Sequence, residues 1–172
     1  EMIKEGCSFL GWKKDGTDVG VGETVTVSGQ TILTARWEEN ASCEVRWQVP
    51  GGEPQYGTLE EALDAAGTTP DVTITVQDGK TASLHTDHTL PESAKLIVPA
   101  GTKIVSDADG AVLTVEGRIE NAGSFDEPVG TLHITESGKL INAGTVRWDI
   151  KPNDGKIDNT GGILGGEVEN TD

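Results

Sequence analysis

Acidic side chains are the most abundant groups in this sequence that could bind a ligand or take part in catalysis. The chain holds 29 Asp and Glu residues against 13 Lys and Arg residues. Asp107, Asp109 and Glu116 follow the spacing of the later ligands of an EF-hand calcium loop, with Gly110 at the turn. The first ligand position falls on Val105, which cannot coordinate calcium. An Asp-Gly turn between two strands explains the same residues. We therefore expect no cofactor, with calcium at these three carboxylates as the alternative.

Histidines form a second candidate group, His85, Asp87 and His88. In a strand, His85 and Asp87 share one face, while His88 points to the other. A third ligand is not evident, because His133 is remote in sequence. The alternatives are a metal site and solvent-facing histidines on a loop.

Aromatic side chains offer a third kind of site. Trp47 and Trp148 are candidate platforms for sugar stacking, but tryptophan is also the largest packing anchor. The sequence shows no dense cluster of Asp, Lys and Arg at strand spacing, no serine–histidine–aspartate order and no phosphate-binding glycine loop. These observations predict that the protein is not an enzyme. The alternative is a carbohydrate-binding or polysaccharide-cleaving β-helix.

Composition indicates a mainly β protein. The chain has 172 residues, 23 of them glycine, and only 4% aromatic residues, which suits short strands joined by tight turns. A formal net charge of −16 opposes binding to nucleic acid or to an anionic membrane surface. No apolar run is long enough to span a bilayer, and the first residues do not read as a signal peptide. A surface location therefore requires the chain to be part of a longer protein.

Strand-like runs in the N-terminal region predict three strands, over residues 8–12, 24–27 and 31–37, with a hairpin connection at 28–30. Its motifs are Gly-Cys-Ser-Phe-Leu-Gly-Trp at 6–12, Val-Thr-Val-Ser-Gly-Gln-Thr-Ile-Leu at 25–33 and Ala-Arg-Trp at 35–37. In order and spacing they resemble the Listeria–Bacteroides repeat family of bacterial surface proteins. The resemblance implies a small β-grasp-like spacer in an exported protein, here expected over residues 1–42. The family's aromatic after Gly6 is replaced by Cys7, which favours a special role for Cys7. The family's first strand is absent, so we expect a chain cut within a repeat.

Two cysteines, Cys7 and Cys43, flank this module. The alternatives are a disulfide that closes the module and two unrelated thiols. No Cys-x-x-Cys motif or Cys/His cluster indicates zinc.

A strand over 43–49 and one helix over 58–67 are expected next. Thr58 as N-cap and Glu61 three residues later form a capping box, and Gly67 is the expected stop. Apolar residues recur on one helix face, at Leu59, Ala62, Leu63 and Ala66. A similar Thr-Leu-x-x-Ala-Leu segment begins parallel β-helices of bacterial surface proteins. The resemblance implies a helix that covers the first coil of a solenoid.

Short apolar strands separated by Gly, Asp, Asn and Pro fill the rest of the chain. Three segments, 96–104, 113–119 and 132–140, each read as a strand, a turn with glycine, a basic residue and a second strand. Their spacing is close to one solenoid coil, so we expect a short right-handed parallel β-solenoid over residues 43–172. An Ile-x-Asn-x-Gly element recurs at Asn121, Asn142 and Asn159, with a partial copy at Asn170. The alternatives are an asparagine ladder between coils and asparagines presented to a ligand.

Together these patterns predict a non-enzymatic piece of a bacterial cell-surface protein, acting as a stalk, spacer or adhesion platform. We expect an extracellular location and a surface glycan or protein as partner. We expect neither nucleic-acid binding nor membrane insertion. The coils run to the last residue without a visible cap, so self-association through an open solenoid end is also expected.

Overall fold

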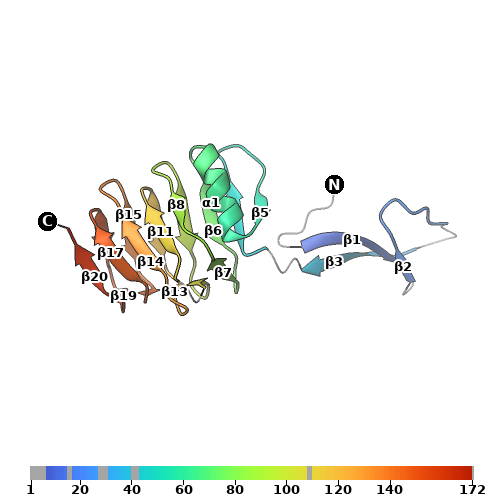
Figure 1. Ribbon diagram of the computed structural model, residues 1–172. Coiled ribbons are helices and arrows are strands. Elements are labelled where there is room, and N and C mark those ends of the chain that lie inside the picture. Colours follow the sequence, from blue (N-terminus) through green and yellow to red (C-terminus); the bar gives the residue numbers. More distant parts are fainter. Residues whose placement is uncertain (1–6, 15–16, 27–30, 40–42, 108–109, 172) are drawn as a thin grey trace. The chain divides into compact units, whose positions relative to one another are not determined.

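The protein is described by a computed structural model that covers residues 7–14, 17–26, 31–39, 43–107 and 110–171 (Figure 1). The chain divides into two compact units, Glu1–Cys43 and Glu44–Asp172. We describe each unit by itself.

The first unit contains a three-stranded antiparallel sheet in the order β2-β1-β3. Its strands are β1 (Cys7–Lys14), β2 (Thr17–Val19) and β3 (Leu33–Glu39). Two of the expected strands are present with shifted ends, but the expected strand at 24–27 is wrong where it is described, because residues 24–26 are not in a strand. β2 takes the second place beside β1, with Val19 opposite Trp12. The expected connection at 28–30 lies outside the described residues.

The second unit is mainly β, with a parallel solenoid of about five coils and one helix. Before the solenoid come β4 (Val45–Gln48), β5 (Gln55–Gly57) and α1 (Leu59–Thr68). The remaining strands are β6 (Thr73–Val76), β7 (Thr81–Leu84), β8 (His88–Leu90), β9 (Lys95–Val98), β10 (Lys103–Ser106), β11 (Val112–Val115), β12 (Arg118–Asn121), β13 (Ser124–Phe125), β14 (Thr131–Ile134), β15 (Lys139–Asn142), β16 (Thr145–Val146), β17 (Asp149–Asn153), β18 (Lys156–Asp158), β19 (Ile163–Leu164) and β20 (Val168–Asn170).

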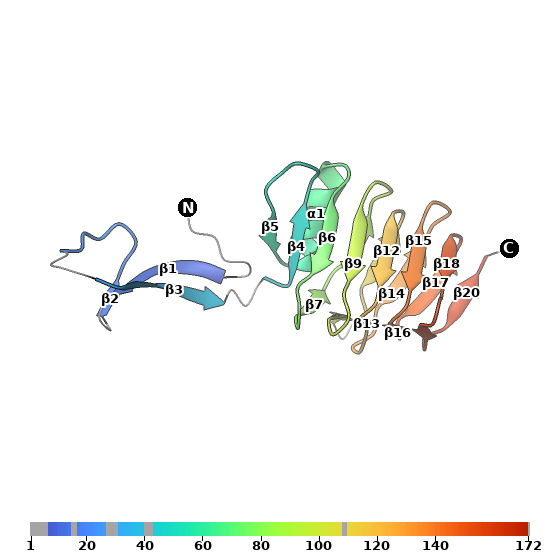
Figure 2. The same cartoon turned by 180° about the vertical axis from the view of Figure 1, so that it is seen from behind.

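Three sheets surround the core of this unit. Sheet 1 has the order β18-β15-β12-β9-β6-β4-β5, sheet 2 the order β19-β16-β13-β10-β7, and sheet 3 the order β20-β17-β14-β11-β8. Along the chain, successive strands enter sheets 2, 3 and 1 in turn, and each pairs in parallel with the strand one coil earlier. Figure 2 shows β9, β12, β15 and β18 side by side in sheet 1. This confirms the expected mainly β fold and parallel β-solenoid.

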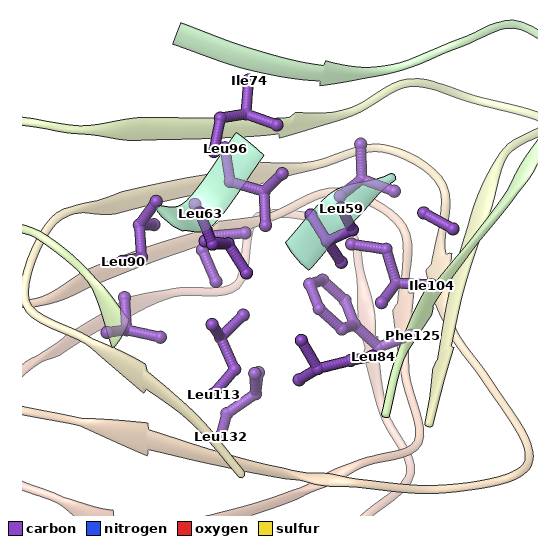
Figure 3. Packing of buried hydrophobic residues seen from close by; sticks show 14 of the residues in the cluster. Leu59, Leu63, Ile74, Leu84, Leu90, Leu96, Ile104, Leu113, Phe125 and Leu132 are labelled. Carbon is purple, nitrogen blue, oxygen red and sulfur yellow. The ribbon is translucent and has the colours of Figure 1, made fainter. Parts of the chain in front are cut away.

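Alternation of side chains builds the core. In strands such as β9, β11 and β15, every second residue is buried, as the period of two in a strand requires. Stacking then aligns the buried residues of sheet 1 in one row, Ile74, Leu96, Ile119 and Leu140. Figure 3 shows the side chains of all three sheets meeting in a common apolar interior. A single coil cannot bury its own apolar face, so each coil depends on its neighbours.

Coil length varies, and this changes the register expected from sequence. Leu113 does stack on Leu132. Leu96, however, pairs with Ile119 in sheet 1 and not with Leu113. One coil separates Asn121 from Asn142 by 21 residues, and the next separates Asn142 from Asn159 by 17. The sheet 1 strands β9, β12 and β15 each keep four residues, so the variation falls largely outside them.

Asparagines form two ladders between coils. In sheet 1, Asn121 Nδ2 donates to Asn142 Oδ1 at 2.8 Å, and Asn142 Nδ2 donates to Asn159 Oδ1 at 2.7 Å. This confirms the structural alternative for these three residues. The expected fourth copy is wrong, because Asn170 lies in sheet 3 and accepts a bond of 2.6 Å from Asn153 Nδ2.

Helix α1 begins as predicted. Thr58 Oγ1 accepts from the Glu61 amide at 3.2 Å, and the Glu61 carboxylate accepts from the Thr58 amide at 3.0 Å. The four predicted apolar residues are all buried and join the core cluster. The predicted stop at Gly67 is one residue early, because the helix ends at Thr68. Figure 3 shows Leu59 and Leu63 pointing into the interior occupied by Leu84 and Leu90.

Candidate functional site

The candidate calcium ligands are not brought together where they are described. Asp107 follows β10 and Glu116 follows β11, so the whole length of β11 separates their positions. Asp107 lines a surface depression with Glu127, Pro128 and Val129, whereas Glu116 lines a different one. Asp109 lies outside the described residues. No group of three His, Cys, Asp or Glu residues within the described ranges is arranged to hold a metal ion.

His85 is exposed between β7 and β8, as the loop alternative expects, whereas His88 lies beside the helix. His88 is in β8, and its side chain is only 15% exposed, so it is not a solvent-facing loop residue. Its Nε2 lies 3.7 Å from Glu60 Oε1, and its Nδ1 lies 3.6 Å from Asp64 Oδ1. Asp87 Oδ1 accepts from the Val112 amide at 2.8 Å, which fastens two coils together. This geometry makes His88 a contact between sheet 3 and α1.

The two tryptophans are parts of the interior. Trp148 is fully buried, its ring meets Phe125 edge to face at 5.3 Å, and its Nε1 donates to the Asp126 carbonyl at 2.9 Å. It therefore cannot present a face to a sugar. Trp47 is partly buried and packs against the core cluster.

The cysteine pairing stays a prediction. Cys43 is 4% exposed. Cys7 begins β1, with its backbone opposite Glu39, and its side chain lies outside what the structure describes.

A column of basic residues crosses the outward face of sheet 1. The parallel register places Lys95 beside Arg118, Arg118 beside Lys139 and Lys139 beside Lys156. We call these four residues the basic column. Neighbouring strands lie about 4.8 Å apart, so the column carries one cation per coil at roughly that interval. Figure 2 shows the strands that carry it, β9, β12, β15 and β18, as neighbours in sheet 1.

Sequence reasoning missed this column because it placed Lys103 in the same repeat position as Arg118 and Lys139. The structure puts Lys103 in sheet 2, beside Ser124. Each cation of the column directly follows a glycine or alanine, at Ala94, Gly117, Gly138 and Gly155, although Gly79 also precedes Lys80 outside the column. At Gly117, a side chain would meet the backbone carbonyls of Pro91 and Ala94 in the preceding coil. Close stacking at this corner therefore demands a small residue before each cation.

A second outward row lies beside the basic column. It contains Ile97, Glu120, Ile141 and Asp158 in register. Glu120 accepts from Lys95 Nζ at 2.8 Å and contacts Arg118 at 2.5 Å. The hydrogen bond from Lys95, opposed in part by burial, lowers the pKa of Glu120 below its usual range. Among the described residues, no carboxylate lies within ion-pair distance of Lys139 or Lys156. One carboxylate, Glu120, thus serves both Lys95 and Arg118, whereas Lys139 and Lys156 have no ion-pair partner in the part of the chain that the structure describes.

Two depressions border this face. One, of about 300 Å³, is lined by Arg46 and the outward side chains of Thr73 and Thr75, which continue the two rows toward β4. The other, of about 620 Å³, is lined by Glu116, Glu136 and Asp154 with Thr135 and Ser137. These carboxylates lie in the turns that lead from sheet 3 to sheet 1. With Glu92 in the preceding coil they form an acidic ridge, two or three residues before each cation.

Comparison with protein-family models, with curated proteins and with solved structures finds no match for this chain.

None of the described helices has the length and apolar character that a membrane crossing requires.

Proposed function

We propose that this chain is a non-enzymatic β-solenoid segment of a bacterial cell-surface protein, serving as a stalk or as a platform for adhesion. The observation that carries the proposal is a single apolar core that begins at α1 and continues through the stacked coils. Stacked coils make a stiff spacer, because each coil pairs with the next through backbone hydrogen bonds and the later coils are also joined by asparagine side chains.

The finer features of the fold belong to the same proposal. We take the solenoid to be right-handed, α1 to cap its first coil and the N-terminal unit to be a β-grasp-like spacer of the Listeria–Bacteroides type. The cap is supported by Glu44, whose Oε2 accepts from the Leu59 amide of α1 and the Ser83 amide of β7, both at 3.2 Å. A carboxylate at a helix N-terminus accepts a hydrogen bond from an amide that has no partner within the helix. Its negative charge also interacts favourably with the positive end of the helix dipole.

The proposed location is extracellular, on the bacterial surface. Antibodies raised against this chain are expected to label intact cells that carry the parent protein, without permeabilisation. Labelling only after the cells are opened would contradict the location.

A carbohydrate-binding or polysaccharide-cleaving β-helix is the second candidate, and the basic column favours its binding form. A glycan array combined with an assay for released reducing ends separates the two candidates. The stalk proposal predicts no released ends from any polysaccharide tested. Release of reducing ends that rises with the concentration of this protein would overturn the non-enzymatic proposal.

A further inference from the structure

We infer that the outward face of sheet 1 binds a linear acidic polysaccharide, held along the basic column. The inference deepens the platform role of the proposed function and names the class of ligand. A stalk needs no such ligand, so the two proposals can fail separately.

Charge is distributed unevenly over the second unit. Residues 44–172 contain nine Lys and Arg residues against 22 Asp and Glu residues. Five of the nine cations lie on this one face of sheet 1, at Arg46, Lys95, Arg118, Lys139 and Lys156. An anion therefore meets more cations on this face than elsewhere on this acidic unit.

The spacing of the cations selects a polymer. One cation per coil, repeated at about 4.8 Å along a line, matches a ligand whose negative charges repeat along its own length. A single small anion would touch only one or two of the side chains of the column. A linear chain gains a contact at each coil, and the several weak contacts add up because they are linked.

The row beside the cations suits sugar rings. Ile97 and Ile141 are half-buried on the outward face and flank Glu120. Sugars carry an apolar C–H face as well as hydroxyls, so these side chains give a ring a surface to lie against while its carboxylate or sulfate meets a cation.

The same face fits other polyanions less well. Neither row contains an aromatic residue between β9 and β18, so bases have no stacking platform. The acidic ridge at Glu92, Glu116, Glu136 and Asp154 runs alongside the column. It repels a wide, densely charged object such as a nucleic-acid duplex or an anionic vesicle, and it confines a narrow chain to the cations.

The test is binding of the whole chain to polygalacturonate and to heparin, measured by titration calorimetry at low salt. Neutral dextran, a single-stranded DNA oligonucleotide and anionic vesicles are the comparison ligands. Binding to at least one acidic polysaccharide, weakened by added salt, is expected. No binding to either acidic polysaccharide, or equal or tighter binding to the DNA or the vesicles, overturns the inference and leaves the stalk proposal intact.

Charge variants locate the site. K139Q combined with K156Q is expected to weaken binding about 25-fold, at about fivefold per cation. The matched control, K80Q with K103Q, removes the same charge directly before β7 and at the start of β10 in sheet 2, outside the basic column. It is expected to leave the affinity within about twofold. E120Q is expected to tighten binding, because it releases Lys95 and Arg118 from their shared carboxylate. This gain cannot come from misfolding. Equal losses in the two lysine pairs, or no gain in E120Q, overturn the assignment to this face.

Discussion

Asn142 lies in the middle of the sheet 1 ladder and is fully buried. Its amide nitrogen donates to Asn159, and its oxygen accepts from Asn121 and from the Gly144 amide. Burying a primary amide is unfavourable unless its hydrogen bonds are made, so each ladder position depends on the next coil being in register. At the first position, Asn121 Oδ1 has no partner within the described residues, so the ladder is least well satisfied there.

Replacing Asn142 with alanine is expected to lower the free energy of unfolding by about 3 kcal/mol, because the mutation leaves buried amide groups of the ladder unpaired. Urea unfolding followed by circular dichroism measures the change. The control is N170A, at the exposed end of the second ladder, with an expected loss below about 1 kcal/mol. Similar losses in the two variants would show that the buried ladder has no special role.

The placement of Asp107 and Glu116 at opposite ends of β11 predicts that calcium does not stabilise the protein. The melting temperature should be the same in chelator and in millimolar calcium. A rise in calcium that disappears in E116Q would instead support the calcium interpretation, with Asp109 as the missing partner.

At the scale of elements, Glu60 joins α1 to the segment before β8. Its Oε1 accepts from the amides of His85 and Thr86 at 2.8 and 2.9 Å and from the Thr86 hydroxyl at 3.1 Å. Burial raises the pKa of Glu60, but these hydrogen bonds and the nearby His88 outweigh it, so the pKa lies below its usual value. The ionised form of Glu60 therefore holds the helix in place.

This arrangement predicts a pH dependence with a definite sign. Because the folded-state pKa of Glu60 is lowered, its contribution is complete above the ordinary glutamate pKa of about 4.3 and is lost as pH falls through the lower folded value. E60Q should therefore be less stable than the parent protein at neutral pH, and the difference should shrink in acid. Urea midpoints at several pH values test this, with E53Q, on an exposed residue before β5, as control. A difference that does not change with pH would contradict the prediction.

At the scale of the whole second unit, the last coil differs from the others. β18, β19 and β20 each lie at the edge of a sheet, and Ile163 and Val168 are 63% and 38% exposed. Unpaired strand edges beside apolar side chains invite pairing with another chain.

We therefore expect the chain, as given by this sequence, to self-associate with rising concentration. I163K combined with V168K should reduce association, because edge lysines oppose strand pairing. V129K, at an exposed valine away from the last coil, should not. Sedimentation velocity over a range of concentrations measures this, and a monomer throughout would contradict the expectation.

Local signals in the sequence determined the features that depend on neighbouring residues. The capping box at Thr58 and Glu61, the apolar face of α1 and the alternation within strands act over a few residues, so pattern alone predicts them. The recurrence of asparagine likewise indicated a ladder as one of two alternatives, and the structure shows it for Asn121, Asn142 and Asn159.

Tertiary structure alone decided which residues of different coils lie side by side. Coils of 21 and 17 residues stack in the same sheet, so no fixed period in the sequence aligns them. The register is chosen by burial of every inward row together with the backbone hydrogen bonds between coils, and both are properties of the stack as a whole. Hence Lys95 belongs with Arg118 and Lys103 does not, and only the folded chain shows Lys95, Arg118, Lys139 and Lys156 as one column.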